Sequence, residues 1–205
     1  MRILITAGPT REPIDPVRFI GNRSSGKLGA ALFEAACRGK HDVTLIVGPV
    51  GLVRPSVRRI DVETAGQMFD AVLREFVAHD LLIMAAAPAD FRPIQISPAK
   101  LGRSGRLVIE CEPTQDIVAA ASRQKRPDQR TVAFSLESAP DLARVRQKML
   151  DKRVDLMVYN PVETMDSPTI QAVLLWPNGS EEPLGCRSKV EFADILLQRA
   201  LALFV

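Results

Sequence analysis

Cysteine and histidine are scarce in this chain, and their scarcity excludes several kinds of site. The 205 residues include three cysteines and two histidines. Cys37, Cys111 and Cys186 are far apart and odd in number, which suits a reducing compartment and predicts three small apolar packing residues rather than metal ligands. His41 and His79 fall at helix–strand junctions, so we expect them at the surface or capping a helix. Any chemistry must therefore depend on positioning and electrostatics rather than on a Ser–His or Cys–His nucleophile.

Long apolar runs and a strong charge bias are also missing. No apolar run reaches the length that spans a bilayer, and the opening MRILITAG lacks the features of a signal peptide. We therefore expect a cytoplasmic protein without membrane contact. The formal net charge is only +3 and the basic residues are spread along the chain, which favours a local anionic ligand over nucleic acid.

Short apolar runs alternate with segments of helical periodicity, which predicts an α/β fold in one domain covering residues 1–205. The first strand–helix–strand unit should be parallel and right-handed. We expect a Rossmann-like three-layer αβα sandwich with a mostly parallel sheet, a mobile flap, and a C-terminal hairpin and helix. The strands are expected at residues 3–6, 42–47, 57–62, 81–84, 107–111, 131–136, 156–158, 172–176 and 182–184. The helices are expected at residues 27–38, 64–79, 115–124, 140–153 and 188–203.

Particular residues are predicted to begin these helices or to face the core. Thr64 and Thr114 are expected as N-caps, and Pro140 is expected to open its helix. The apolar spacing places Val77 and Val190 on buried helix faces.

The connection between the first strand and the first helix covers residues 7–25, whereas such connections usually have about 2–6 residues, so we expect it to serve function. It ends in Gly21-Asn-Arg-Ser-Ser-Gly26-Lys27, which has the spacing of a P-loop. Leu28 stands where a P-loop has the Ser or Thr that holds Mg²⁺, so a P-loop phosphotransferase is disfavoured. Two readings remain, an anion site at the helix N-terminus and an ordinary capped helix.

Gly8 does not open a G-x-G-x-x-G motif, and no acidic residue ends the second strand, so no NAD is expected. The small residues after the strand at 81–84 should let a ligand approach the backbone closely.

Residues 91–106 have no periodic pattern but hold four basic residues, which predicts a mobile cationic flap. Lys100 is then either a solvated loop lysine or a cation that closes over a triphosphate. Lys148 and Lys152 are four residues apart and share one helix face. Two interpretations are open: the face is solvated, or the two lysines clamp phosphates.

Several motifs of the chain are those of one known family. The loop ITAGPTREPIDPVRFIGNRSSGK closely resembles the opening signature of phosphopantothenoylcysteine synthetases, the phosphopantothenate–cysteine ligases of coenzyme A biosynthesis. The later segments AAAPADFRP, SPAKL, PTQDIV, VAFSLES and RSKVEFADILL are similar to further blocks of that family in order and spacing.

The resemblance implies a reaction and a set of ligands. The carboxylate of 4′-phosphopantothenate would attack the α-phosphate of CTP, assisted by Mg²⁺, and the amine of cysteine would then attack the acyl-cytidylate. It also implies a homodimer, with the flap and the terminal strands near the interface. Because the flavin-binding decarboxylase domain found in many bacterial members is absent here, we expect no flavin, and a separate phosphopantothenoylcysteine decarboxylase is a possible partner. An ATP-dependent ligase and a non-catalytic nucleotide-binding paralogue remain alternatives.

The same resemblance implies roles for individual residues, without a protein ligand for a metal. Asn22 would hold the acyl-nucleotide with Arg18 nearby, and Lys100 would neutralise phosphates. The nucleotide would contact Met84, Ala85, Ala86, Asp90, Gln115, Asp116, Ile117, Val118, Phe134, Lys148 and Lys152. The substrate or phosphate loop would consist of Gly8, Ser24, Ser25, Gly26 and Lys27.

Some positions depart from the family pattern. Gly102 and Arg103 stand where further flap lysines are usual, and Asn160-Pro161 replaces an Asn-Asp pair. These departures bear on nucleotide choice and rate, and they are what motivates the paralogue alternative.

Overall fold

A computed structural model describes residues 1–51, 58–103, 105–165 and 167–205. These residues form an eight-stranded sheet in the order β12-β11-β10-β9-β6-β1-β4-β5. Its strands are β1 Arg2–Ala7, β4 Asp42–Val47, β5 Arg58–Asp61, β6 Leu81–Met84, β9 Arg130–Glu137, β10 Leu156–Pro161, β11 Thr169–Leu175 and β12 Glu181–Ser188. Neighbouring strands pair in parallel along the series β5, β4, β1, β6, β9 and β10. The strands β11 and β12 then continue the sheet in antiparallel pairs. The predicted mostly parallel sheet and terminal hairpin are confirmed.

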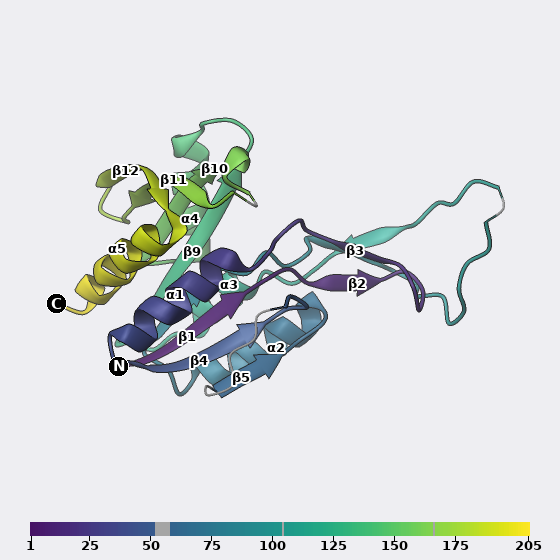
Figure 1. Cartoon of the computed structure of the whole chain (residues 1–205), viewed down its shortest axis with the longest axis horizontal. Coiled ribbons are helices and arrows are strands. Elements are labelled where there is room, and N and C mark those ends of the chain that lie inside the picture. Colours follow the sequence, from purple (N-terminus) through teal and green to yellow (C-terminus); the bar gives the residue numbers. More distant parts are fainter. Residues whose placement is uncertain (52–57, 104, 166) are drawn as a thin grey trace.

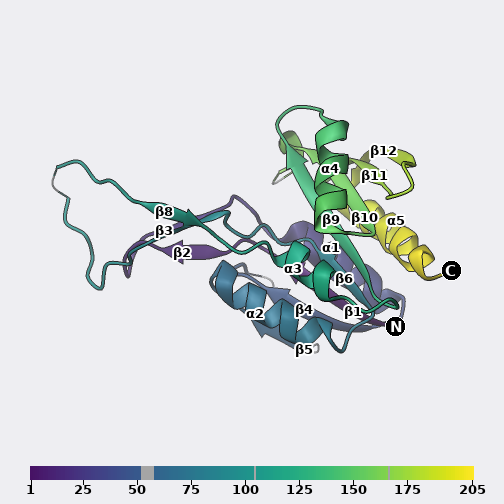
Figure 2. The same cartoon turned by 180° about the vertical axis from the view of Figure 1, so that it is seen from behind.

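Helices cover both faces of this sheet, which confirms the three-layer sandwich (Figures 1 and 2). The helices are α1 Lys27–Arg38, α2 Ala65–Phe76, α3 Ile117–Gln124, α4 Leu142–Lys152 and α5 Lys189–Leu201, with short 3-10 turns at Val162–Thr164 and Ala202–Phe204. One core lies under α1 and α5 and the other under α2, α3 and α4. Alternate residues of β1 serve the two cores, since Ile3 and Ile5 belong to the first and Leu4 to the second.

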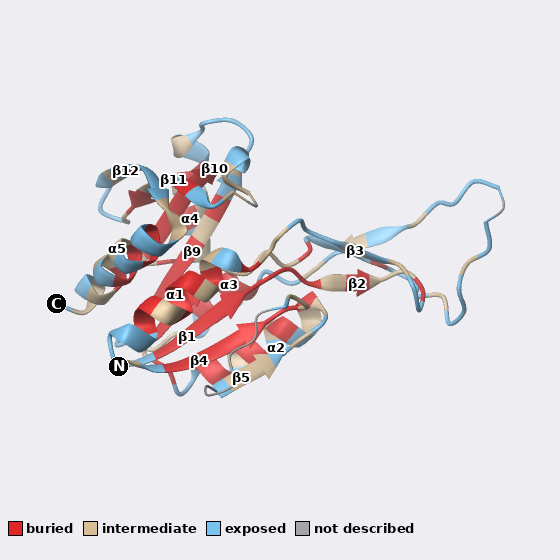
Figure 3. Ribbon diagram, in the orientation of Figure 1, coloured by how far each residue is buried: buried red, intermediate tan, exposed pale blue. Residues whose placement is uncertain are grey.

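Two short antiparallel ribbons extend from the sheet as an arm, which we define as residues 11–21 and 91–113 (Figure 1). The first pairs β2 Arg11–Pro13 with β3 Phe19–Gly21, and the second pairs β7 Phe91–Pro93 with β8 Cys111–Pro113. Much of the arm is exposed (Figure 3). The strand predicted at residues 107–111 is wrong, because β8 begins only at Cys111 and residues 107–110 belong to the projecting loop.

Several predicted helix details are also wrong. Asp116, not Thr114, caps α3 by accepting from the Ala119 N–H at 3.0 Å. Val77 lies beyond the last residue of α2 and is 72% exposed, and Val190 in the first turn of α5 is 52% exposed. The buried positions of α5 are Phe192, Ala193, Leu196, Leu197 and Ala200.

Other boundaries differ slightly from the prediction. Asp141 caps α4, which begins two residues after the expected Pro140. The strand predicted at residues 57–62 is β5, and Val57 lies outside the described residues. Thr64 caps α2 as predicted, in a capping box with Gln67.

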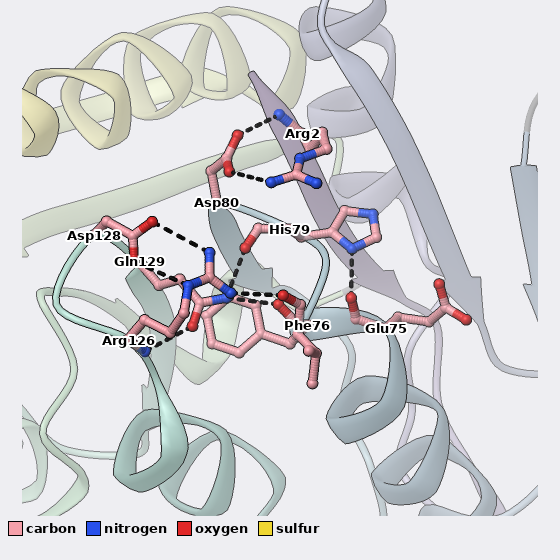
Figure 4. A network of polar contacts seen from close by, with 9 residues as sticks. Arg2, Glu75, Phe76, His79, Asp80, Arg126, Asp128 and Gln129 are labelled. Carbon is pink, nitrogen blue, oxygen red and sulfur yellow. Dashed lines mark hydrogen bonds and ion pairs between the residues drawn. The ribbon is translucent and has the colours of Figure 1, made fainter.

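The cysteine prediction is wrong, because all three thiols lie on exposed residues. His79 is buried rather than at the surface, but it does cap a helix end, with Nδ1 2.6 Å from the Glu75 carbonyl oxygen and Nε2 2.9 Å from Thr44 Oγ1. Figure 4 shows the surrounding polar network, in which Gln129 donates to the carbonyls of Phe76 and His79 at 2.6 and 2.7 Å. This network fixes the end of α2 against the beginnings of the strands.

None of the helices in the described part of the chain combines the length and the hydropathy that a bilayer-spanning helix needs.

Candidate active site

A cavity of about 630 Å³ opens at the carboxyl ends of the parallel strands. After β1, the chain adds β4 and β5 on one side of that strand and then β6, β9 and β10 on its other side. The strand order therefore reverses between β1 and β6. Open α/β sheets bind ligands at such a switch point. The cavity, which we call the cleft, is lined by residues 22–29, 84–90, 114–118 and 133–136 together with Lys148, Lys152, Met157, Asn160, Thr164, Met165, Ile170 and Lys189. Its volume falls within the range of about 300–1,000 Å³ usual for small-molecule sites.

The loop at residues 85–90 is held against residues 6–10, which form the end of β1 and the segment after it. Three of its backbone N–H groups donate to alternate residues of that segment, from Ala86 to Thr6 Oγ1 at 3.1 Å, from Ala87 to the Gly8 carbonyl at 2.9 Å and from Ala89 to Thr10 Oγ1 at 2.9 Å. Gly8 has a φ of +80°, which favours glycine. Gly8, which was predicted in the site, supports the loop at residues 85–90 through its carbonyl and is not among the residues that line the cleft.

Two further side chains join this loop to the other walls. Asn22 Nδ2 donates to the Pro88 carbonyl at 2.8 Å, and Thr114 Oγ1 donates to the Ala89 carbonyl at 2.6 Å. The Thr114 hydroxyl, which was predicted to cap α3, thus holds the loop at residues 85–90 instead. The small side chains of the loop leave its backbone close to any ligand, as the sequence predicted.

The N-terminus of α1 forms another wall. Gly26 is its N-cap with a φ of +72°, and among the described residues no side chain accepts a capping hydrogen bond there. The reading of an ordinary capped helix is therefore excluded, and the first-turn N–H groups carry the partial positive charge that binds anions. Gly29 lets the helix approach β1, because a Cβ there would lie 2.4 Å from Ala7 Cβ.

Charge in the cleft is dominated by cations. The described lining residues include two acids, Asp90 and Asp116, and five cations, Arg23, Lys27, Lys148, Lys152 and Lys189. Such an excess raises the local concentration of an anionic ligand.

Two of these lysines are held by carboxylates. Lys148 Nζ lies 2.5 Å from Glu137 Oε1, and Lys152 Nζ lies 3.0 Å from Asp116 Oδ2. Burial alone would raise the pKa of Glu137, but hydrogen bonds from Lys148 and from Ser135 Oγ, at 2.6 Å, hold it below its ordinary value. The ion pairs fix both ammonium groups beside the cleft, so these lysines do not form a purely solvated face.

The structure does not bring all the predicted residues together within one chain. The cleft is lined by Asn22, Ser24, Ser25, Gly26, Lys27, Met84, Ala85, Ala86, Asp90, Gln115, Asp116, Ile117, Val118, Phe134, Lys148 and Lys152. Arg18 and Lys100 line a different cavity, of about 650 Å³, in the arm, with Leu101, Gly102, Arg103, Gly105 and Leu107. The expectation that Lys100 shares one cleft with Lys148 and Lys152 is therefore wrong for a single chain in this conformation.

Sequence reasoning missed several residues that build the cleft. Thr6 lies in β1, but Gly8 with its φ of +80° interrupts the extended backbone before Thr10, so the strand period could not have identified both hydroxyls. Glu137 and Asn160 lie at the carboxyl ends of β9 and β10, where open α/β sheets bind ligands. Among the described residues, no group of three or more His, Cys, Asp or Glu side chains is arranged to hold a metal ion.

Comparison with known proteins identifies a family for this chain. A model of the family described as the DNA/pantothenate metabolism flavoprotein C-terminal domain matches residues 1–203. The chain is 40% identical over 205 residues to the coenzyme A biosynthesis bifunctional protein CoaBC of Vibrio vulnificus (strain YJ016), covering 96% of this chain and 51% of that protein. It therefore spans about half the length of this relative.

Solved structures agree. The crystal structure of the C-terminal domain of a CoaBC protein superposes with a TM-score of 0.83 at 35% identity, covering 98% of this chain and 95% of that one. A mutant of Cab2 in complex with phosphopantothenate-cysteine superposes with a TM-score of 0.80, covering 98% and 85%, and at 18% identity it shows the shared fold. The resemblance predicted from the motifs is confirmed. The chain belongs to the family of DNA/pantothenate metabolism flavoprotein C-terminal domains.

Proposed function

We propose that this domain is a phosphopantothenate–cysteine ligase, which joins 4′-phosphopantothenate to L-cysteine through an acyl-cytidylate in coenzyme A biosynthesis. The observation that carries the proposal is the cationic cleft at the β1/β6 switch point, with an uncapped helix N-terminus on one side and two lysines on the other. The relative from Vibrio vulnificus is named for coenzyme A biosynthesis, and the Cab2 structure holds the product of this reaction. The family and the charge of the cleft thus support the same activity.

The chemistry needs no nucleophile from the protein. A carboxylate oxygen of 4′-phosphopantothenate forms a bond to the α-phosphorus of CTP while the bond to the pyrophosphate oxygen breaks. The cysteine amine then attacks the acyl carbon, the cytidine monophosphate leaves with the bonding electron pair, and the amine loses a proton to solvent. Both steps need alignment and charge neutralisation, which the α1 N-terminus and the cleft cations can supply. Mg²⁺ would be carried by the phosphates.

Specific residues take roles in this proposal. Lys27, Ser24 and Ser25 at the helix N-terminus bind phosphate oxygens, and Lys148 and Lys152 neutralise the pyrophosphate. The loop from Met84 to Asp90, the turn from Gln115 to Val118 and the ring of Phe134 hold the nucleoside. Asn22, which joins the two loops through the Pro88 carbonyl, holds the acyl-nucleotide in this proposal.

We further propose that the protein acts in the cytoplasm as a homodimer formed through the arm, with a separate decarboxylase consuming its product. The arm carries exposed apolar side chains that a second copy would cover, at Val17, Phe19, Phe91, Ile94, Ile96, Leu107 and Val108. A dimer also offers Lys100 a route to a cleft, because the arm of one copy can reach the body of the other. Light scattering on the wild type and on Phe91→Glu tests this, since the variant should be monomeric.

Mixing two variants with strongly reduced activity tests which cleft Lys100 serves. If it serves the partner, mixed dimers of Lys100→Ala and Lys148→Ala chains regain one intact site each. If it serves its own chain, no activity returns on mixing.

The decisive test of function is pyrophosphate release. It should require 4′-phosphopantothenate and a nucleotide, and a product containing cysteine should form only when cysteine is added. CTP and ATP are compared directly, because either would serve the same chemistry. Tight CTP binding without release would identify a non-catalytic paralogue, and failure with every nucleotide would refute the ligase.

A further inference from the structure

A fully buried carboxylate lies in the turn between β2 and β3. The side chain of Asp15 is 0% exposed, although it belongs to the projecting arm. Its Oδ1 accepts from the backbone N–H groups of Val17 and Arg18, both at 2.8 Å. Its Oδ2 accepts from the Leu101 N–H at 3.1 Å and lies 3.4 Å from Arg18 Nε. A buried carboxylate with this many donors is held in one orientation.

These contacts also keep the group charged. Burial by itself would raise the pKa of Asp15, but the N–H groups of Val17, Leu101 and Arg18 and the charge of the Arg18 guanidinium hold it below its ordinary value. The carboxylate is therefore an anion at neutral pH, and it orients the Arg18 side chain that faces the arm cavity.

Asp15 and Arg18 together clasp the backbone of one residue, Leu101, in the loop between β7 and β8. The Leu101 N–H is bound by Asp15, and the Leu101 carbonyl accepts from Arg18 Nη2 at 2.6 Å. The Ser97 N–H donates to the Ile14 carbonyl at 2.9 Å, which adds a second tie between the same two segments. Lys100 immediately precedes the clasped residue, so its backbone position depends on this pair.

We propose that Asp15 is a positioning residue of the ligase, which sets the geometry of Arg18 and Lys100 in the arm cavity. The proposal rests on the proposed function, because it assigns a consequence for the reaction. Asp15 touches neither substrate nor nucleotide, and its effect passes through the two cations. A misplacement of about 1 Å in a reacting group can lower a rate by about 100-fold, so loss of the clasp should be visible in turnover.

Asp15→Asn is the informative variant. Its amide keeps one oxygen for the Val17 and Arg18 N–H groups, so the turn is retained. The new NH₂ group faces the Leu101 N–H and Arg18 Nε, which are both donors, so the clasp is lost. Asp15→Ser serves as a second variant, because serine also stabilises such turns and is too short to reach Leu101. Asp70→Asn makes the same chemical change on an exposed residue of α2 and is the matched control.

Four measurements separate positioning from a merely structural role. We expect Asp15→Asn to lower kcat/KM for 4′-phosphopantothenate by about 10-fold to 100-fold. The affinity for CTP alone should change much less than kcat/KM, because Lys27, Lys148 and Lys152, which line the cleft, lie outside the arm. Amide hydrogen exchange should rise in the peptide covering residues 97–103 and stay constant in the peptide covering residues 84–90. In the Lys100→Ala background, Asp15→Asn should cause a much smaller further loss, since one partner of the positioning is already gone.

The outcomes are distinct. The role of Asp15 would be overturned, and the ligase left intact, if the wild type were active and Asp15→Asn were fully active too. The same conclusion would follow if the two losses in kcat/KM multiplied fully in the double variant. A wild type that releases no pyrophosphate would overturn the proposed function itself. If Asp15→Asn lost CTP affinity as well, the residue would be structural, and the proposal would fail.

Discussion

The close contact between α1 and β1 gives a sharp test of how the anion site is built. In Gly29→Ala, the added Cβ would lie 2.4 Å from Ala7 Cβ and 2.9 Å from Ala7 Cα. Carbon atoms in contact normally lie about 3.5–4.0 Å apart, so the helix must move by about 1 Å or more. Overpacking of this kind costs about 1–3 kcal/mol. The better helix propensity of alanine returns at most about 1 kcal/mol, so we expect a net destabilisation.

Gly66→Ala is the control for this prediction. Gly66 also lies in the first turn of a helix, but a Cβ there would have only Thr64 Oγ1 nearby, at 3.8 Å. This variant should equal or exceed the wild type in stability, because it gains propensity without a clash.

Urea denaturation of both variants measures the difference, and CTP titration shows whether the α1 N-terminus has moved. In thermal denaturation of a chain of this size, a difference of about 1 kcal/mol in the free energy of unfolding corresponds to a Tm change of about 2–4 °C. If Gly29→Ala is as stable as Gly66→Ala and binds CTP like the wild type, the packing argument is wrong.

Three further predictions concern the polar network, the cleft and pH. Gln129→Ala removes the side-chain donor of the His79 carbonyl and one of two donors of the Phe76 carbonyl, which keeps the His79 N–H at 3.0 Å, so we expect a loss of about 1–3 kcal/mol, measured by urea denaturation. Lys148→Met should weaken CTP binding in calorimetry without unfolding the chain, whereas unchanged affinity would remove this lysine from the site. Because the pKa of Glu137 is lowered by folding, its stabilising effect is present above the unfolded value of 4.5 and is lost as pH falls through the lower folded value. The stability gap between wild type and Glu137→Gln should therefore shrink below about pH 4.5, and a constant gap would contradict this reasoning.

The body of the fold was predictable because its signals are local. Residues 27–38 and 42–47 coincide with α1 and β4, since helical and strand periodicity and short turns act within one segment. The errors occur where a neighbour decides. Val190 has apolar spacing but lies at the exposed start of α5, and His79 looks like a surface junction residue until Thr44 and Gln129 enclose it. Nothing in the sequence around those positions reports the distant partner.

The arm shows why the candidate site could be predicted only in part. Residues that line the cleft follow strand ends, and the order of strands in an α/β sheet brings strand ends together, so the motif positions lead there directly. Arg18 and Lys100 instead owe their position to pairing between segments more than eighty residues apart, through Leu101 and Asp15. The described residues between 91 and 106 carry no periodicity because they pair with residues 110–113 and with residues 14–18 of the arm. The motifs therefore identify both groups of residues, but only the tertiary pairing shows that one group lines the cleft and the other lies in the arm.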